Sequence, residues 1–180
     1  MVEEAMLEDT GSGLAPAGDG WFVVNLADAH WRRHDAFGAA CRLEGEKVEF
    51  PHFGVNVRVL WPGQPNCMYH AELEQEGFLV LAGECLLLVE GHERRLRAWD
   101  FAHCPPWTEH VFVGAGDGPC AILMIGARGR PESAVRYQVS SLAQRHGASV
   151  EAETTDPNEA YARYPRSRSE RLPDLGFPWQ

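Results

Sequence analysis

Two histidines and two glutamates in the middle of the chain carry side chains that can hold a metal ion. His70 and Glu72 are separated by one residue, Glu76 follows soon after, and His110 lies further along the chain. Imidazole nitrogens and carboxylate oxygens are the usual ligands of catalytic zinc and of non-heme iron. The sequence therefore predicts a metal pocket, without indicating its substrate, from His70, Glu72, Glu76 and His110.

β-Strands would have to bring these residues together. On a strand, side chains two positions apart point to the same face, so His70 and Glu72 are expected to share one face. Glu76 opens an apolar run at 77–82, and His110 opens another. If Glu72 and Glu76 both point into a closed barrel, two carboxylates share a poorly solvated space. A divalent cation would remove the cost of charging both.

The middle of the chain has the pattern of a β-barrel or a β-sandwich. It contains many short apolar or alternating runs separated by glycine-containing turns, and Glu90-Gly91 is typical of a tight hairpin turn. Such a succession favours closed antiparallel architecture. The predicted strands are 55–61, 78–82, 85–89, 93–98, 101–104, 110–113 and 120–125.

The two ends of the chain differ from this middle part. The first twenty residues are rich in Gly, Ala, Pro and acids without periodicity, which predicts a flexible tail. Residues 21–24 are a first strand candidate, and 28–37 allow a short helix. Capping patterns predict short helices at 141–146 and from Pro157. We therefore divide the chain into a tail (1–20), a barrel domain (21–130) and a C-terminal extension packed on the barrel (131–180).

Composition excludes several classes of partner. The 180 residues suffice for one domain with a sizeable core, and the net charge of −10 argues against nucleic-acid binding and against anionic membrane surfaces. No run approaches the roughly 20 apolar residues that span a bilayer. The acidic N-terminus lacks the features of a secretory signal. The five cysteines show no CxxC pairing, which predicts reduced thiols and a cytoplasmic location.

Taken together, the string of motifs resembles the cupin superfamily, and it looks closest to the small single-domain bacterial cupins. The resemblance covers about residues 54–127. It implies an all-β fold, a double-stranded β-helix or jelly-roll barrel, here with an N-terminal strand extension and short C-terminal helices. The frame of the first cupin motif is occupied by His70, Glu72, Glu76 and Gly83, and that of the second by Asp100, Pro105 and His110.

One position departs from the cupin pattern. Cupins commonly bind metal through three histidines and one glutamate, and Glu72 stands where the second histidine is expected. The resemblance then implies a set of two histidines and one carboxylate, a pattern of non-heme iron oxygenases. Glu72 is either a fourth ligand or, if it does not bind metal, the general base. Iron, zinc and manganese are all compatible with these donors.

The resemblance implies a metal-dependent enzyme, of oxygenase or isomerase type, that acts on a small organic molecule in the barrel. Two alternatives stay open. One is a non-catalytic cupin that binds or senses a small ligand. The other is a degenerate barrel without metal, in which His70 and His110 are hydrogen-bonded interior residues and Glu72 points to water. Because cupins often pair through barrel edges, a homodimer is also expected.

Overall fold

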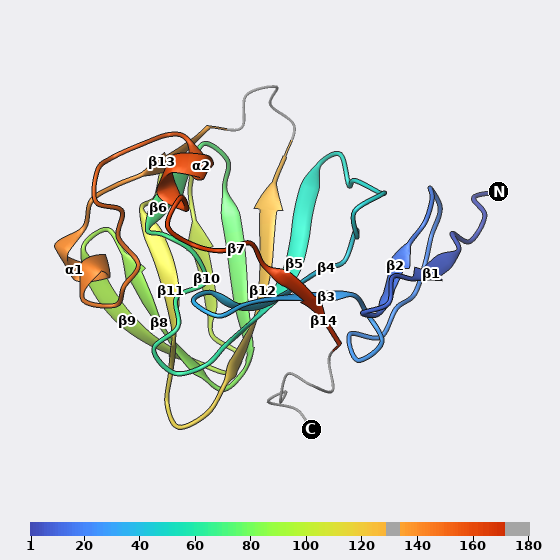
Figure 1. Ribbon diagram of the computed structural model, residues 1–180, viewed down its shortest axis with the longest axis horizontal. Coiled ribbons are helices and arrows are strands. Elements are labelled where there is room, and N and C mark those ends of the chain that lie inside the picture. Colours follow the sequence, from blue (N-terminus) through green and yellow to red (C-terminus); the bar gives the residue numbers. More distant parts are fainter. Residues whose placement is uncertain (129–133, 172–180) are drawn as a thin grey trace.

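The computed structural model describes residues 1–128 and 134–171. Within these residues the chain forms a barrel from a seven-stranded and a five-stranded antiparallel sheet, with a separate two-stranded hairpin that projects from it (Figure 1). The predicted all-β jelly roll is confirmed. No helix in the described ranges is long and apolar enough to cross a membrane.

The larger sheet forms one wall of the barrel. Its central strands pair over long registers, with β12 lying between β5 and β7. In spatial order its strands are β10 (Phe101–Cys104), β7 (Glu76–Ala82), β12 (Cys120–Ala127), β5 (Phe53–Leu60), β4 (Gly38–Arg42), β3 (Trp31–His34) and β14 (Arg168–Glu170).

The smaller sheet forms the opposite wall. Its strands are, in spatial order, β13 (Val135–Tyr137), β6 (His70–Glu72), β11 (His110–Ala115), β8 (Glu84–Val89) and β9 (His92–Arg97). The hairpin between β8 and β9 turns at Glu90-Gly91, as predicted. All seven strands predicted between residues 55 and 125 are present, because their period of two matches a wall with one buried face.

The N-terminal twenty residues correct one expectation. Strands β1 (Leu7–Asp9) and β2 (Leu14–Pro16) pair as a hairpin, whereas the sequence predicted no regular structure there. The hairpin lies at the far end of the molecule from α1 (Figure 1). The strand predicted at 21–24 is also wrong, since among these residues only Trp21 forms a bridge, to Glu4.

The short helix allowed at 28–37 is wrong as well. This segment contains β3, which turns back into β4, and β4 then pairs with β5. Ala and Arg favour helices locally, but pairing with an existing sheet and burial of Trp31 outweigh that preference. An N-terminal extension of the sheet is thus present, but β3 and β4 form it and residues 21–24 do not.

The C-terminal part contains two short helices, as predicted. Helix α1 (Ser141–Gln144) begins after Ser140, whose side chain accepts a hydrogen bond from the Ala143 amide. Helix α2 (Pro157–Ala160) begins after Asp156, whose carboxylate accepts from the Asn158 amide. Strands β13 and β14 were not predicted, because three-residue edge strands carry too few residues to show a period. Residues 129–133 and 172–180 of the barrel and extension lie outside the described residues.

Candidate metal centre

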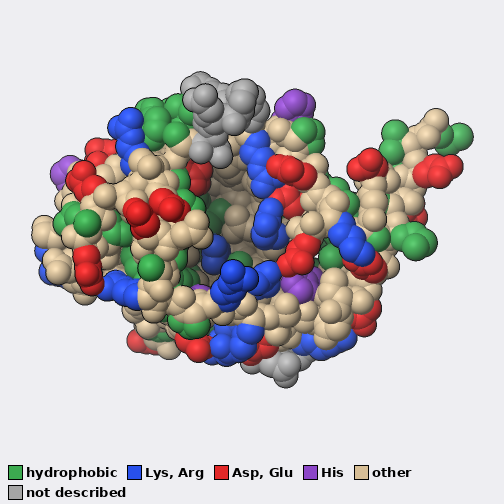
Figure 2. Space-filling view, turned by 45° about the horizontal axis from the view of Figure 1, so that its top comes forward, with side chains coloured by type: hydrophobic (Ala, Val, Ile, Leu, Met, Phe, Trp, Pro, Cys, Tyr) green, Lys and Arg blue, Asp and Glu red, His purple; other side chains and the backbone are tan. Residues whose placement is uncertain are grey.

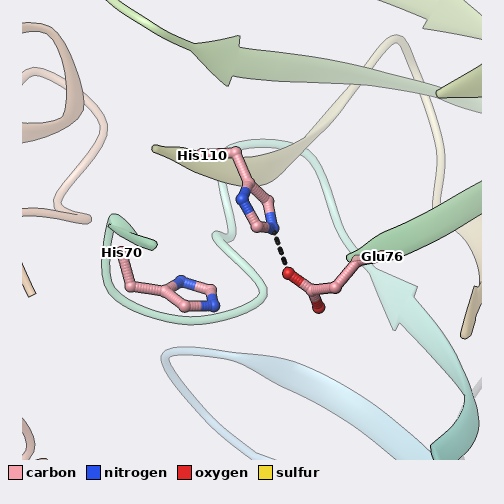
Figure 3. A group of neighbouring side chains, drawn as sticks. All are labelled: His70, Glu76 and His110. Carbon is pink, nitrogen blue, oxygen red and sulfur yellow. Dashed lines mark ion pairs between the residues drawn. The ribbon is translucent and has the colours of Figure 1, made fainter. Parts of the chain in front are cut away.

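Three of the four predicted ligands converge at the mouth of the barrel (Figure 3). His70 and His110 are direct partners across β6 and β11 in the smaller sheet. Glu76 opens β7 in the larger sheet. One donor atom from each of the three side chains lies within 4.8 Å of the other two. Both walls of the barrel therefore contribute to one site.

Backbone carbonyls fix the orientation of both imidazole rings. The Nδ1 atom of His70 lies 2.9 Å from the Met68 carbonyl, and Nδ1 of His110 lies 3.0 Å from the Thr108 carbonyl. A carbonyl only accepts, so each Nδ1 must carry the proton and donate it. In the neutral ring this leaves a lone pair on Nε2, which is the tautomer that binds metals.

Each of these Nε2 atoms faces a carboxylate. His110 Nε2 lies 3.3 Å from Glu76 Oε2, and His70 Nε2 lies 3.4 Å from Glu72 Oε1. A neutral imidazole Nε2 and an ionised carboxylate oxygen are both acceptors, so they repel unless a proton or a cation lies between them. The donor set therefore fits a divalent cation, with His70, Glu76 and His110 as the residues that would hold it.

Burial separates the acid–base properties of the site. Burial and the nearby Glu72 raise the pKa of Glu76 to about 7. Burial and the nearby His70 lower the pKa of His110 to about 4, so this ring is neutral at physiological pH. His110 and Glu76 side chains are 1% and 15% exposed. A cation would find one neutral imidazole already in place and a carboxyl group that releases its proton readily on binding.

Glu72 differs from the other three residues in position. Its side chain is 41% exposed and lines the cavity, and it is not part of the group of three whose donor atoms converge. Although burial lowers the pKa of His70, its contacts with Cys67 and Glu72 raise that pKa well above the usual value, so without a metal its Nε2 is protonated. The hydrogen bond from this Nε2 lowers the pKa of Glu72, which is therefore an ionised carboxylate. It is placed to accept a proton from a molecule bound in the cavity.

The cavity above the three converging residues has a volume of about 760 Å³, large enough for a small organic molecule. Figure 2 looks into this hollow and shows Lys and Arg side chains along one side of it. Its lining includes acids, arginines, tyrosines and a few apolar groups. Among these lining residues are Asn56, Arg58, Cys67, Glu72, Arg128 and Tyr161.

Two lining residues on β5 were not recognised from the sequence. Asn56 and Arg58 alternate with Val55, Val57 and Val59, a pattern we interpreted as a strand with one wet face. The polar side chains line the cavity instead of the outer surface. The alternation was visible, but a polar face toward bulk water and one toward an internal cavity have the same period.

Comparison with known proteins agrees with this architecture. Residues 56–126 match the family model described as a cupin domain. No curated protein gives a significant sequence match.

Two solved structures indicate the range of similar proteins. A sugar phosphate isomerase of the cupin superfamily from Silicibacter pomeroyi is 26% identical, with a TM-score of 0.55 over 64% of this chain and 81% of that one. The polyketide cyclase RemF from Streptomyces resistomycificus is 17% identical, with a TM-score of 0.53 over 81% of this chain and 94% of that one. The second likeness concerns the fold alone.

Proposed function

Because the chain belongs to the cupin superfamily, we propose that it is a metal-dependent isomerase in which His70, Glu76 and His110 hold a divalent ion. The observation that carries this proposal is the convergence of one donor atom each from His70, Glu76 and His110 within 4.8 Å, with Nδ1 of both histidines bonded to backbone carbonyls. Iron, zinc and manganese are all compatible with these donors. The substrate is a small organic molecule of a size that the cavity admits.

The bound ion would supply Lewis acidity to an oxygen atom of the substrate. Glu72 is the residue that moves a proton, because its ionised carboxylate lies in the cavity and beside His70. The barrel walls limit the access of water to the ligands, since His70 and His110 are 8% and 1% exposed.

Isomerisation is preferred to oxygenation as the reaction type. The solved structure of a sugar phosphate isomerase shares 26% identity with this chain, which supports the isomerase class. An exposed carboxylate placed as a base is also what proton transfer between neighbouring carbons requires. An oxygenase would use the same metal ligands but would need dioxygen as a co-substrate.

One experiment tests the ion and the reaction together. Elemental analysis of the isolated protein should find close to one divalent ion per chain. The metal-loaded protein is then given a panel of small hydroxy and keto compounds in D₂O. It should catalyse the incorporation of deuterium into a compound of the panel at the same rate with and without dioxygen. Glu72→Gln should retain the ion and lose the exchange. A protein without metal, or turnover that consumes dioxygen, would contradict the proposal.

We also propose a homodimer in a reducing, cytoplasmic compartment. Phe53, Phe101 and Ile125 share the outer face of the larger sheet and are 46%, 67% and 43% exposed. A second copy of the chain would cover this apolar surface. All five cysteines are free, which supports a reducing environment. Light scattering should give the mass of a dimer for the wild type and of a monomer for Phe101→Glu.

A further inference from the structure

Among the residues that the structure describes, the Arg58 guanidinium has no acidic partner, and it lines the cavity that holds the three converging residues. Arg58 is on β5, and its neighbours in register are Ala40 on β4 and Ile122 on β12. Ile122 is fully buried in the barrel interior, so the register turns Arg58 inward as well. Both Arg58 and His70 contribute to the cavity lining. An arginine and a candidate metal ligand therefore line the same cavity.

No hydrogen bond and no carboxylate ion pair holds Arg58 within residues 1–128 and 134–171. The titratable groups that interact with it are the Cys67 thiol and the Tyr161 hydroxyl. Arg58 is half-buried, and this burial lowers its pKa. A desolvated charge without a counter-charge is costly, so such a group is expected to meet an anion.

The other arginines nearby are engaged differently. Arg128 donates to both carboxylate oxygens of the buried Glu44, at 2.7 and 2.8 Å. Arg42 donates to the same carboxylate at 2.9 Å. These contacts neutralise only part of the positive charge, because one buried carboxylate faces two guanidinium groups. Glu49 approaches Arg128 at 3.8 Å, but its side chain is 80% exposed.

The space around Arg58 continues toward these two residues. A second cavity of about 390 Å³ extends over β4 and shares four lining residues with the first. The shared residues are Gly54, Asn56, Arg58 and Arg128. Gly54 leaves room for Arg128, since a Cβ atom there would lie 2.9 Å from the guanidinium. The cavity therefore has a metal-binding end and an arginine-rich end.

We propose that Arg58, with Asn56 beside it, binds the phosphate of a phosphomonoester substrate whose reacting carbon lies toward His70, Glu76 and His110. A phosphomonoester fits because it carries nearly two negative charges at neutral pH and offers several acceptor oxygens. A guanidinium binds such oxygens in a bidentate manner, and the Asn56 amide adds a neutral donor. The position of the reacting carbon rests on the proposed function, whereas the anion site itself does not.

Inorganic phosphate is the probe for this site. Calorimetric titration of the full chain, freed of metal by chelator and kept at pH 8 in low salt, should detect binding. Arg58→Gln should weaken binding by about tenfold or more, since a charge-assisted hydrogen bond is lost. The matched control is Arg94→Gln on the exposed strand β9, which should bind as the wild type does.

Two further variants separate the possible outcomes. Asn56→Asp places a carboxylate beside Arg58 and should also abolish binding, which keeps the test valid if Arg58→Gln does not fold. His70→Ala should bind phosphate normally while losing the metal. A wild-type protein that holds no metal but binds phosphate through Arg58 would overturn only the proposed function. Unchanged affinity in Arg58→Gln, no binding by the wild type, or equal affinity for acetate would overturn the phosphate site.

Discussion

His70 and His110 owe their readiness for a metal to two backbone carbonyls. Each ring donates its Nδ1 proton to the carbonyl two residues earlier in the chain, at 2.9 and 3.0 Å. The contact is local, so it forms as soon as the segment before each strand adopts its turn. It fixes the ring before any ligand arrives and reduces the ordering that binding would require.

The first prediction concerns single ligands. His110→Ala should lower metal affinity by at least about a hundredfold, because even groups that only orient a ligand contribute about ten- to a hundredfold. His103→Ala is the control, since this exposed histidine contacts Gln75 and not the three converging residues. Elemental analysis after dialysis measures the difference. Equal metal content in both variants would exclude His110 from the site.

At the scale of elements, the turn between β7 and β8 depends on a glycine. Gly83 has a φ of +70°, and a Cβ atom there would lie 2.5 Å from the Pro119 carbonyl oxygen. Gly91, in the next hairpin, has a similar φ of +72° but open space around it. The two positions therefore differ in packing while sharing the same backbone conformation.

The second prediction uses this matched pair. Gly91→Ala should cost about 1 kcal/mol of unfolding free energy, because L-residues disfavour a positive φ. Gly83→Ala should cost about 1–3 kcal/mol more, because the added methyl group also forces the turn away from Pro119. Urea denaturation of both variants checks the difference. Equal losses of unfolding free energy in the two variants would mean that the turn at residue 83 accommodates the methyl group at no additional cost.

Glu44 joins the segment after β4 to the end of β12. Its side chain is 1% exposed and accepts hydrogen bonds from Arg42, Arg128 and the Phe50 amide. Although burial alone raises the pKa of Glu44, the hydrogen bonds from Arg128 and its neighbours outweigh burial and lower it to about 2. The carboxylate is thus charged in the folded protein at pH values where the unfolded chain already takes up a proton.

The third prediction follows from that difference. A depressed folded pKa stabilises the protein above the unfolded value of about 4.5, and the contribution is lost as pH falls toward about 2. The loss should be on the order of 3 kcal/mol between pH 5 and pH 2. Urea denaturation at several pH values should show a flatter profile for Glu44→Gln. Glu151→Gln, at an 88% exposed side chain, should keep the wild-type profile.

At the scale of the whole molecule, the three converging residues connect the two walls of the barrel. Glu76 comes from the seven-stranded sheet, and His70 and His110 come from the five-stranded sheet. An ion held by all three would therefore resist separation of the sheets. Metal binding and global stability should be coupled, because the unfolded chain does not hold these residues together.

The fourth prediction measures this coupling. A divalent ion at a hundredfold excess over its dissociation constant should stabilise the wild type by about 2.7 kcal/mol and raise its melting temperature. Chelator should reverse the change, and His110→Ala should show no shift. Hydrogen exchange should slow in both β7 and β11. Slowing confined to one strand would indicate binding at a different place.

The sequence by itself determined the strands of the barrel and the identity of the ligand candidates. Seven strands between residues 55 and 125 were predictable, because their alternation is a local property of the chain. The resemblance to the cupin motifs singled out His70, Glu72, Glu76 and His110, which spacing alone only suggested. The two C-terminal helices were predictable from the spacing of Ser141 and Gln144 and from Asp156-Pro157. The structure shows that Ser140, one residue before the expected cap, and Asp156 cap them through contacts that span only two or three residues.

Only the tertiary structure decided which polar groups meet. The strand at 31–34 forms because β4 and β14 pair with it, and such contacts leave no local period. Glu72 lies 3.4 Å from His70 but does not belong to the group of three whose donor atoms converge, and the spacing of the four residues does not reveal this. Whether the polar face of β5 meets bulk water or a cavity depends on how the barrel closes. Arg58 could therefore be recognised as a cavity residue only after the register of distant strands was known.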